Sequence, residues 1–398
     1  MSLSLALLFS SCSHAQQFKK EKQSESFGEQ VIVGAERTKD YFPLLSGKRV
    51  GIVANQTSHI GNIHLVDSLL YAGINAVKVF GPEHGFRGNT ADGVEINSGI
   101  DANTGIPIIS LYGSHKKPTP EDLEDLDIVV FDIQDVGARF YTYISTMSYV
   151  MEACAENNVE FMVLDRPNPH GDYVDGPVLE IGFSSFVGMH PIPVVHGMTV
   201  GEYAQMVNGE GWLKDSIQCK LTVISCEKYN HNTIYQLPIA PSPNLPNNIA
   251  IQLYPSICFF EGTIISVGRG TDFPFQVIGH PDFAIGSFVF TPEEIPGVAK
   301  NPKYKGEQCY GQALQGFEES VVAKERRLHL SLLINMNEYF KEKDDFFTAY
   351  FEKLAGSDKL KNQINEGFSE DEIRASWKND LNEFKKIRKK YLLYPDFE

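Results

Sequence analysis

The 398-residue sequence lacks several features that assign a protein to a class at first sight. Its 35 basic residues are outnumbered by 51 acidic ones, and the net charge of −16 disfavours binding to nucleic-acid phosphates. Its six cysteines include no C-x-x-C pair, which argues against a zinc ribbon or a thioredoxin-like site. No run approaches the ~18 apolar residues that a transmembrane helix needs. The sequence therefore predicts an acidic globular protein without a nucleic-acid partner.

Motifs for common cofactors and nucleophiles are also missing. The chain contains no G-x-G-x-x-G after its first predicted strand, no G-x-x-x-x-G-K-[ST], no H-E-x-x-H and no G-x-S-x-G. A dinucleotide, a nucleoside triphosphate, a catalytic zinc ion and a serine nucleophile are thus disfavoured. His84, His196 and His280 have no second ligand at metal-binding spacing, which favours packing or hydrogen-bonding roles. We expect no cofactor and no metal.

The N-terminus has the pattern of an export signal. Leu3–Phe9 is an apolar run too short to span a bilayer, and small residues follow it. Residues 1–15 are predicted to be a secretory signal cleaved after Ala15, or a lipoprotein signal in which Cys12 carries the lipid. Both predict a protein that is periplasmic or lipid-anchored to the cell envelope, with membrane contact only through Cys12. A segment without signal function is the alternative.

Length predicts two domains, because a single core stops growing at about 250–300 residues, and the pattern of the first domain predicts a doubly wound α/β fold. Short apolar runs alternate with helical stretches from Lys48 onward, as in a parallel sheet with helical crossovers. The predicted strands are 49–54, 76–80, 106–112, 127–132 and 161–165, and the predicted helices are 64–72, 120–126 and 143–157. A Pro/Asn-rich stretch at 237–248 is either a domain boundary or a functional loop.

Polar clusters follow three of the predicted strands, at the strand ends where open α/β sheets bind ligands. Each cluster combines a carboxylate with a nearby arginine: Glu83, His84 and Arg87; Asp135, Arg139 and Tyr141; Asp165, Arg166 and Asn168. Because the carboxyl ends of parallel strands meet at one edge, we expect the clusters to converge on a single crevice. Asp132, inside a predicted strand, is expected to be structural.

Paired carboxylates without metal or nucleophile motifs favour glycoside hydrolysis. One carboxylic acid protonates the leaving oxygen, and a second carboxylate supports the oxocarbenium-like transition state or activates water. Glu83 is the predicted acid, since Pro82 and Phe86 offer the apolar setting that raises a carboxyl pKa. Asp135 is the preferred second carboxylate, and Asp165 is the alternative.

The arginines predict an anionic or N-acetyl-bearing sugar. Arg139 and Arg166 are candidates for binding such a substituent, because a guanidinium pairs bidentately with a carboxylate. The competing interpretation is that Asp165 and Arg166 form an internal ion pair that only holds their loop.

The same residues carry a resemblance to a known family. The segments around Glu83, Asp135 and Asp165 resemble motifs of the NamZ-type exo-β-N-acetylmuramidases, long catalogued as a domain of unknown function. The matching segments occur in family order: 82–85, 132–143, 165–169, 175–179, 196–202, 241–246, 261–263 and 267–271. The resemblance is close over residues 33–281 and general over the rest.

The resemblance implies a fold and an activity. It implies a Rossmann-like catalytic domain with a mainly parallel sheet at 30–250, and a smaller C-terminal α/β domain at 251–398 that closes the cleft. It also implies release of N-acetylmuramic acid (MurNAc) from the non-reducing end of peptidoglycan fragments such as MurNAc-GlcNAc. The lactyl carboxylate of MurNAc suits an arginine-bearing crevice.

Glu83 matches the family's glutamate as the catalytic acid, and Asp135 and Asp165 match cleft positions. The predicted substrate-binding residues are His84, Arg87, Arg139, Tyr141, Arg166, Asn168, His196, Asn244, Glu261 and Arg269. A non-catalytic protein that binds cell-wall sugars or muropeptides is the alternative function. A wall esterase or amidase is disfavoured, because no activated nucleophile or zinc set is visible. The sequence gives neither the oligomeric state nor the stereochemistry of hydrolysis.

Overall fold

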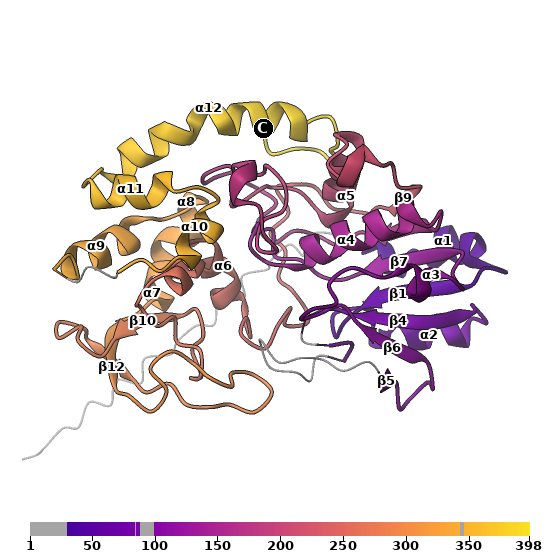
Figure 1. The fold of residues 1–398 in the computed structure, drawn as a ribbon, viewed down its shortest axis with the longest axis horizontal. Helices are drawn as coiled ribbons and strands as arrows, with labels where there is room; N and C mark the ends of the chain where they lie inside the picture. Colours follow the sequence, from indigo (N-terminus) through magenta and orange to yellow (C-terminus); the bar gives the residue numbers. More distant parts are fainter. Residues whose placement is uncertain (1–29, 84, 88–98, 343–345) are drawn as a thin grey trace, which may run out of the picture. The chain divides into compact units, whose positions relative to one another are not determined.

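A seven-stranded sheet in the order β5-β6-β4-β1-β7-β8-β9 organises the first part of the chain (Figure 1). The computed structural model describes residues 30–83, 85–87, 99–342 and 346–398. The strands of the sheet are β1 (Val50–Ala54), β4 (Ala76–Gly81), β5 (Gly99–Ile100), β6 (Pro107–Ser110), β7 (Ile128–Asp132), β8 (Glu160–Leu164) and β9 (Leu221–Ile224). Its pairings are parallel except that of β5 with β6. The predicted, mainly parallel α/β fold is confirmed.

Helices cover both faces of this sheet because its central strands are apolar on both sides. In β7, Val129 and Phe131 belong to the core that includes residues of α4 and α5, whereas Ile128 and Val130 belong to the core that includes residues of α1 and α2. The helices of this part are α1 (Thr38–Leu45), α2 (Leu65–Tyr71), α3 (Pro120–Leu123), α4 (Tyr143–Glu156) and α5 (Val200–Gly209). The short strands β2 (His59–Ile60) and β3 (Ile63–His64) form a separate hairpin.

The predicted boundaries of these elements are mostly close to the observed ones. The five predicted strands correspond to β1, β4, β6, β7 and β8. Thr119 caps α3 through a capping box, but the helix ends at Leu123, three residues before the predicted end. Strands β5 and β9 were not predicted, because runs of two and four residues give little periodicity.

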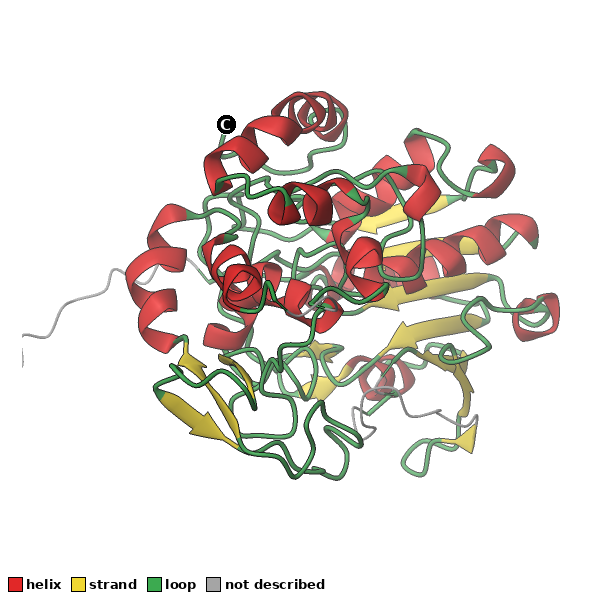
Figure 2. Ribbon diagram, turned by 60° about the vertical axis from the view of Figure 1, so that its left-hand side comes forward, coloured by secondary structure: helices red, strands yellow, loops and turns green. Residues whose placement is uncertain are grey.

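The second part of the chain carries a small antiparallel sheet and several helices, separate from the large sheet in Figure 2. Its strands, in the order β10-β12-β11, are β10 (Val277–His280), β11 (Phe288–Phe290) and β12 (Cys309–Ala313). Its helices are α6 (Asn248–Ile257), α7 (Gln315–Phe317), α8 (Ala323–Glu325), α9 (Ser331–Tyr339), α10 (Tyr350–Ala355), α11 (Lys359–Asn365) and α12 (Glu370–Arg388).

Both parts of the chain contribute to one continuous apolar core. Phe140 lies after β7 of the large sheet. Its ring packs edge-on against those of Tyr254 in α6 and Phe259, at centroid distances of 5.4 and 5.7 Å. Residues Val31–Glu398 accordingly form one compact unit. The division of the chain into 30–250 and 251–398 stays a prediction.

The five cysteines among the described residues are all free and buried: Cys154, Cys219, Cys226, Cys258 and Cys309. Within the described ranges, every helix is too short or too polar to cross a membrane. The predicted signal at residues 1–15, including Cys12, lies outside the described residues.

Candidate active site

A cavity of about 460 Å³ opens at the carboxyl ends of β4, β6 and β7. This volume lies in the range of small-molecule sites, and the position is the one that open α/β sheets use for ligands. The wall is largely aromatic and carries four charged side chains. Its residues are Glu83, Tyr112, Gly113, Lys116, Phe140, Tyr141, Thr142, Tyr143, Phe186, Val187, Ser242, Asn244, Leu245, Tyr254, Glu261, Arg269, Phe275 and Tyr350.

Glu83 reaches the cavity from a tight turn just after β4. The Gly85 amide donates to the Pro82 carbonyl at 2.9 Å, and Gly85 has a φ of +79°, a backbone conformation that glycine adopts readily. The half-buried Glu83 carboxylate accepts a hydrogen bond from the Thr142 hydroxyl at 3.1 Å. Because Thr142 directly precedes α4, the carboxylate is held between the ends of two neighbouring elements of the fold.

A second carboxylate, Glu261, lines the same cavity from the second part of the chain. The Arg269 Nε donates to Glu261 Oε1 at 2.6 Å, and the Arg269 guanidinium lies 5.0 Å from the centroid of the Phe275 ring. Burial raises the pKa of Tyr350, and the nearby charges of Glu261 and Glu83 add to this effect. Tyr350 therefore lies within electrostatic reach of both carboxylates.

Neutral polar groups complete the wall. The Asn244 Nδ2 donates to the Val298 carbonyl at 3.1 Å, while its buried Oδ1 has no hydrogen-bond partner among the described residues. Burial raises the pKa of Tyr141 well above its usual value, so its hydroxyl keeps its proton at neutral pH. These groups offer a ligand an acceptor and a donor beside the two carboxylates.

Of the predicted site residues, the structure brings Glu83, Tyr141, Asn244, Glu261 and Arg269 together in this wall. The two other predicted catalytic carboxylates lie elsewhere. Asp135 is buried, and its Oδ2 accepts from the Gly137 amide at 2.7 Å; burial raises its pKa to about 7.

Asp165 is buried as well and accepts four hydrogen bonds. Its donors are the Thr199 hydroxyl at 2.7 Å, the Tyr394 hydroxyl at 2.5 Å, and the amides of Arg166 at 3.0 Å and Gly201 at 2.8 Å. Burial raises the pKa of Asp165 to about 6. A carboxylate enclosed in this way anchors the loop after β8 and the start of α5.

The predicted sugar-binding arginines are engaged within the fold. Arg166 forms a buried ion pair with Asp132, at 2.6 Å from Nε to Oδ1, and not with Asp165. The Arg139 guanidinium, completely buried, donates to the carbonyls of Pro177, Ile192 and Leu354 at 2.7–2.8 Å. Neither side chain lines the cavity. The structure therefore does not support the prediction that Arg139 or Arg166 contacts the substrate directly.

Three further predicted residues, Asn168, His196 and Arg87, also do not line the wall. Asn168 donates to the Met198 carbonyl at 2.8 Å, and the ring of His196 is buried, which lowers its pKa to about 3. Arg87 pairs with Asp101 at 2.8 Å and with Asp67 at 3.3 Å. His84 lies outside the described residues.

Sequence reasoning did not name the other 13 of the 18 wall residues as site residues; Lys116, Thr142, Phe186 and Tyr350 are among them. Lys116 follows a predicted strand, so the rule that found Glu83 applies to it as well. Thr142 lies in a segment that was singled out, but for other residues. Tyr350 carried no signal, because it comes from a short helix far along the chain.

Within the described part of the chain, no group of three or more His, Cys, Asp or Glu side chains is arranged to hold a metal ion. The fold and the cavity, with two glutamates among aromatic walls at the ends of parallel strands, define a carboxylate-based glycoside hydrolase of the α/β class.

Comparison with known proteins gives the family. The N-terminal model of the exo-β-N-acetylmuramidase NamZ family matches residues 50–249, and its C-terminal model matches residues 252–394. The chain belongs to this family. It is 41% identical over 373 residues to the peptidoglycan β-N-acetylmuramidase NamZ of Bacillus subtilis, with 89% of each chain covered.

Solved structures show the same fold. A DUF1343 family protein from Bacteroides fragilis is 51% identical, with a TM-score of 0.85 over 92% of this chain and 99% of that one. A second DUF1343 protein from the same organism is 32% identical, with a TM-score of 0.76 and the same coverage.

Proposed function

We propose that this chain is an exo-acting glycoside hydrolase that releases MurNAc from the non-reducing end of peptidoglycan fragments. Membership in the NamZ family and the likeness to the Bacillus subtilis enzyme support this function. The observation that carries the proposal is the Glu83 carboxylate in the cavity wall, with Glu261 in the same wall. Two carboxylates facing one sugar-sized space are what hydrolysis of a glycosidic bond requires.

Glu83 is assigned the role of catalytic acid. In its protonated form it gives its proton to the glycosidic oxygen as the bond from that oxygen to C1 of MurNAc breaks. Water then supplies the hydroxyl group at C1 and returns a proton, so that the reaction is a net hydrolysis. The Thr142 hydroxyl fixes one carboxylate oxygen, which orients the group toward the cavity.

Glu261 takes the place of the second carboxylate, in preference to Asp135 and Asp165. Glu261 lines the cavity, whereas those two aspartates are buried and do not line it. Its ion pair with Arg269 fixes a negative charge beside the position where positive charge develops on the sugar ring. The separation of Glu261 from Glu83 determines whether Glu261 acts as a nucleophile, as a general base or by electrostatic stabilisation of the transition state.

The release of product tests the function. Purified protein is incubated with MurNAc-GlcNAc, and the products are identified by mass. Free MurNAc and free GlcNAc are expected. Binding of the disaccharide without any product over a range of pH would favour the non-catalytic sugar-binding alternative. Loss of an acyl or peptide group with the disaccharide intact would identify an esterase or amidase.

We also propose that the chain is exported and acts at the cell envelope. The apolar run Leu3–Phe9 followed by Cys12 supports export, as does a peptidoglycan substrate. Expression in the native cell followed by mass analysis of the mature N-terminus tests this. A start at Gln16 indicates cleavage of a secretory signal, a lipid-modified Cys12 indicates an anchor, and an intact Met1 contradicts export.

A further inference from the structure

Lys116 belongs to the cavity wall and lies on the loop after β6. This strand is the neighbour of β4, which precedes Glu83. Strands β4 and β6 pair in parallel, with Gly81 opposite Ser110 at their carboxyl ends. Glu83 follows β4 by two residues, and Lys116 lies on the loop that leads from β6 toward α3. The pairing of the two strands therefore brings an acid and a cation to the same cavity.

The Lys116 ammonium is held by an aromatic ring and not by a carboxylate. Its Nζ lies 4.5 Å from the centroid of the Phe186 ring, and this ring stacks on Tyr149 with centroids 6.1 Å apart. Within the described ranges, Lys116 takes part in no ion pair. The other cation of the wall, Arg269, is paired with Glu261. Lys116 thus presents a positive charge to the cavity that the described residues do not neutralise.

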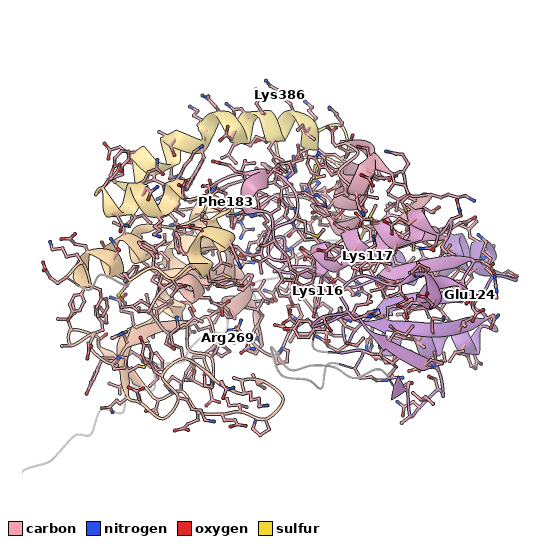
Figure 3. All side chains as sticks on the ribbon, in the orientation of Figure 1. Lys116, Lys117, Glu124, Phe183, Arg269 and Lys386 are labelled. Carbon is pink, nitrogen blue, oxygen red and sulfur yellow. The ribbon has the colours of Figure 1, made fainter. Side chains whose placement is uncertain are left out.

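The neighbouring lysine provides the contrast. Lys117 is turned to α4, where it pairs with Glu152 at 2.6 Å and with Glu156 at 2.7 Å, and it does not line the cavity. Figure 3 labels both lysines, and in this view Lys116 lies on the side of Arg269. Two adjacent residues of the same type therefore differ in whether their charge faces the cavity.

We propose that Lys116 receives the free lactyl carboxylate of a terminal MurNAc residue and so selects muramyl ends that carry no stem peptide. This inference rests on the proposed function. MurNAc differs from GlcNAc by the lactyl ether on O3, whose carboxylate is the one negative charge of the sugar. An ammonium pairs with that carboxylate, but a stem peptide converts the carboxylate into a neutral amide and removes the charge-assisted bond. Lys116 thereby fills the role that sequence reasoning gave to Arg139 and Arg166.

Calorimetric binding of the free sugars tests Lys116 separately from catalysis. Affinities for MurNAc, its lactyl amide and GlcNAc are measured with the wild type and with Lys116→Met, Lys116→Arg and Lys117→Met. The wild type is expected to prefer MurNAc over both neutral sugars. Lys116→Met should lower the ratio of MurNAc to GlcNAc affinity by about 10- to 100-fold. Lys116→Arg should restore part of this ratio, and Lys117→Met should keep it.

Two results overturn the inference. One is that the wild type binds the lactyl amide as tightly as MurNAc. This result does not depend on the folding of any variant. The other is a MurNAc to GlcNAc ratio that is unchanged in Lys116→Met, or lowered as much in Lys117→Met, at equal thermal stability. Turnover of MurNAc-GlcNAc by the wild type is measured as well, so that a failure of the inference can be distinguished from a failure of the proposed function. Lys116-dependent binding without turnover would contradict the function alone, and turnover with Lys116-independent binding would contradict the inference alone.

Discussion

At the scale of single residues, the structure distinguishes carboxylates that face the cavity from carboxylates that support it. Glu83 and Glu261 line the wall, whereas Asp135 and Asp165 are buried and bonded to backbone amides. A sequence shows which residues follow a strand, and this information drew attention to Glu83, which lines the cavity. It does not show whether the chain then turns a side chain outward or inward, since that depends on the donors that surround it.

The first prediction separates Glu261 from Asp135. Glu261→Gln removes a negative charge from the cavity wall, so kcat on MurNAc-GlcNAc should fall by about 100-fold or more. Asp135→Asn keeps an acceptor for the Gly137 amide and should lower kcat by less than about tenfold. Steady-state kinetics of the two variants checks this, with circular dichroism as a control for folding. A larger loss in Asp135→Asn would return the catalytic role to Asp135.

The second prediction concerns the pH dependence of stability. Burial raises the pKa of Asp135 from 3.8 to about 7 in the folded protein, so loss of its proton costs folding free energy. Its stabilising contribution is complete below about pH 4 and is lost as the pH rises to about 7. The unfolding free energy of the wild type relative to Asp135→Asn should therefore fall by up to a few kcal/mol over this range. Urea unfolding at pH 4.5, 6.0 and 7.5 measures it, and a constant difference would contradict the assignment.

At the scale of elements, neighbouring strand ends are linked by buried charge. Asp132 ends β7, and Arg166 follows β8 by two residues; because these strands pair in parallel, the two side chains meet. From the sequence, Asp132 was expected to be structural, and an internal ion pair with Asp165 was the competing interpretation of Arg166; the ion pair exists, but its partner is Asp132. The partner across the sheet was missed because pairing between strands is a tertiary property.

The third prediction follows from this ion pair. Asp132→Asn or Arg166→Met leaves one buried charge without its partner and should lower the unfolding free energy by about 3–5 kcal/mol. The double variant should be destabilised by much less than the sum of the two, because it leaves no uncompensated charge. Urea unfolding of the three variants forms the double-mutant cycle. Additive losses would show that the two groups do not interact.

Five of the seven strands of the large sheet were predicted from the sequence. Strands β1, β4, β6, β7 and β8 were located because their residues are apolar on consecutive positions. The short strands β5 and β9 depend on pairing with longer neighbours, which a local pattern does not reveal. Tyr350 and Glu261 reach the cavity only because the second part of the chain folds against the first, and family motifs, not periodicity, drew attention to Glu261.

At the scale of the whole molecule, bulk charge and local charge differ. The chain carries a net charge of −16, yet the cavity wall contains two glutamates balanced by Lys116 and Arg269. An acidic protein with a charge-balanced cavity can accept an anionic sugar without the repulsion that its surface would impose. Composition disfavours nucleic acid as a partner, whereas the family motifs and the placement of individual side chains point to a muramyl sugar.

The central claim is that Glu83 protonates the leaving oxygen. The most direct test is whether the loss of kcat/KM on substitution of Glu83 depends on the leaving group. A sugar hydroxyl is a poor leaving group that needs the proton, whereas a nitrophenol departs readily without it. The measurement compares kcat/KM of the wild type and Glu83→Gln on MurNAc-GlcNAc and on nitrophenyl β-MurNAc. The account predicts a loss of about 10²- to 10⁴-fold on the disaccharide and a far smaller loss on the nitrophenyl substrate. Equal losses on both substrates, or none on either, would contradict it.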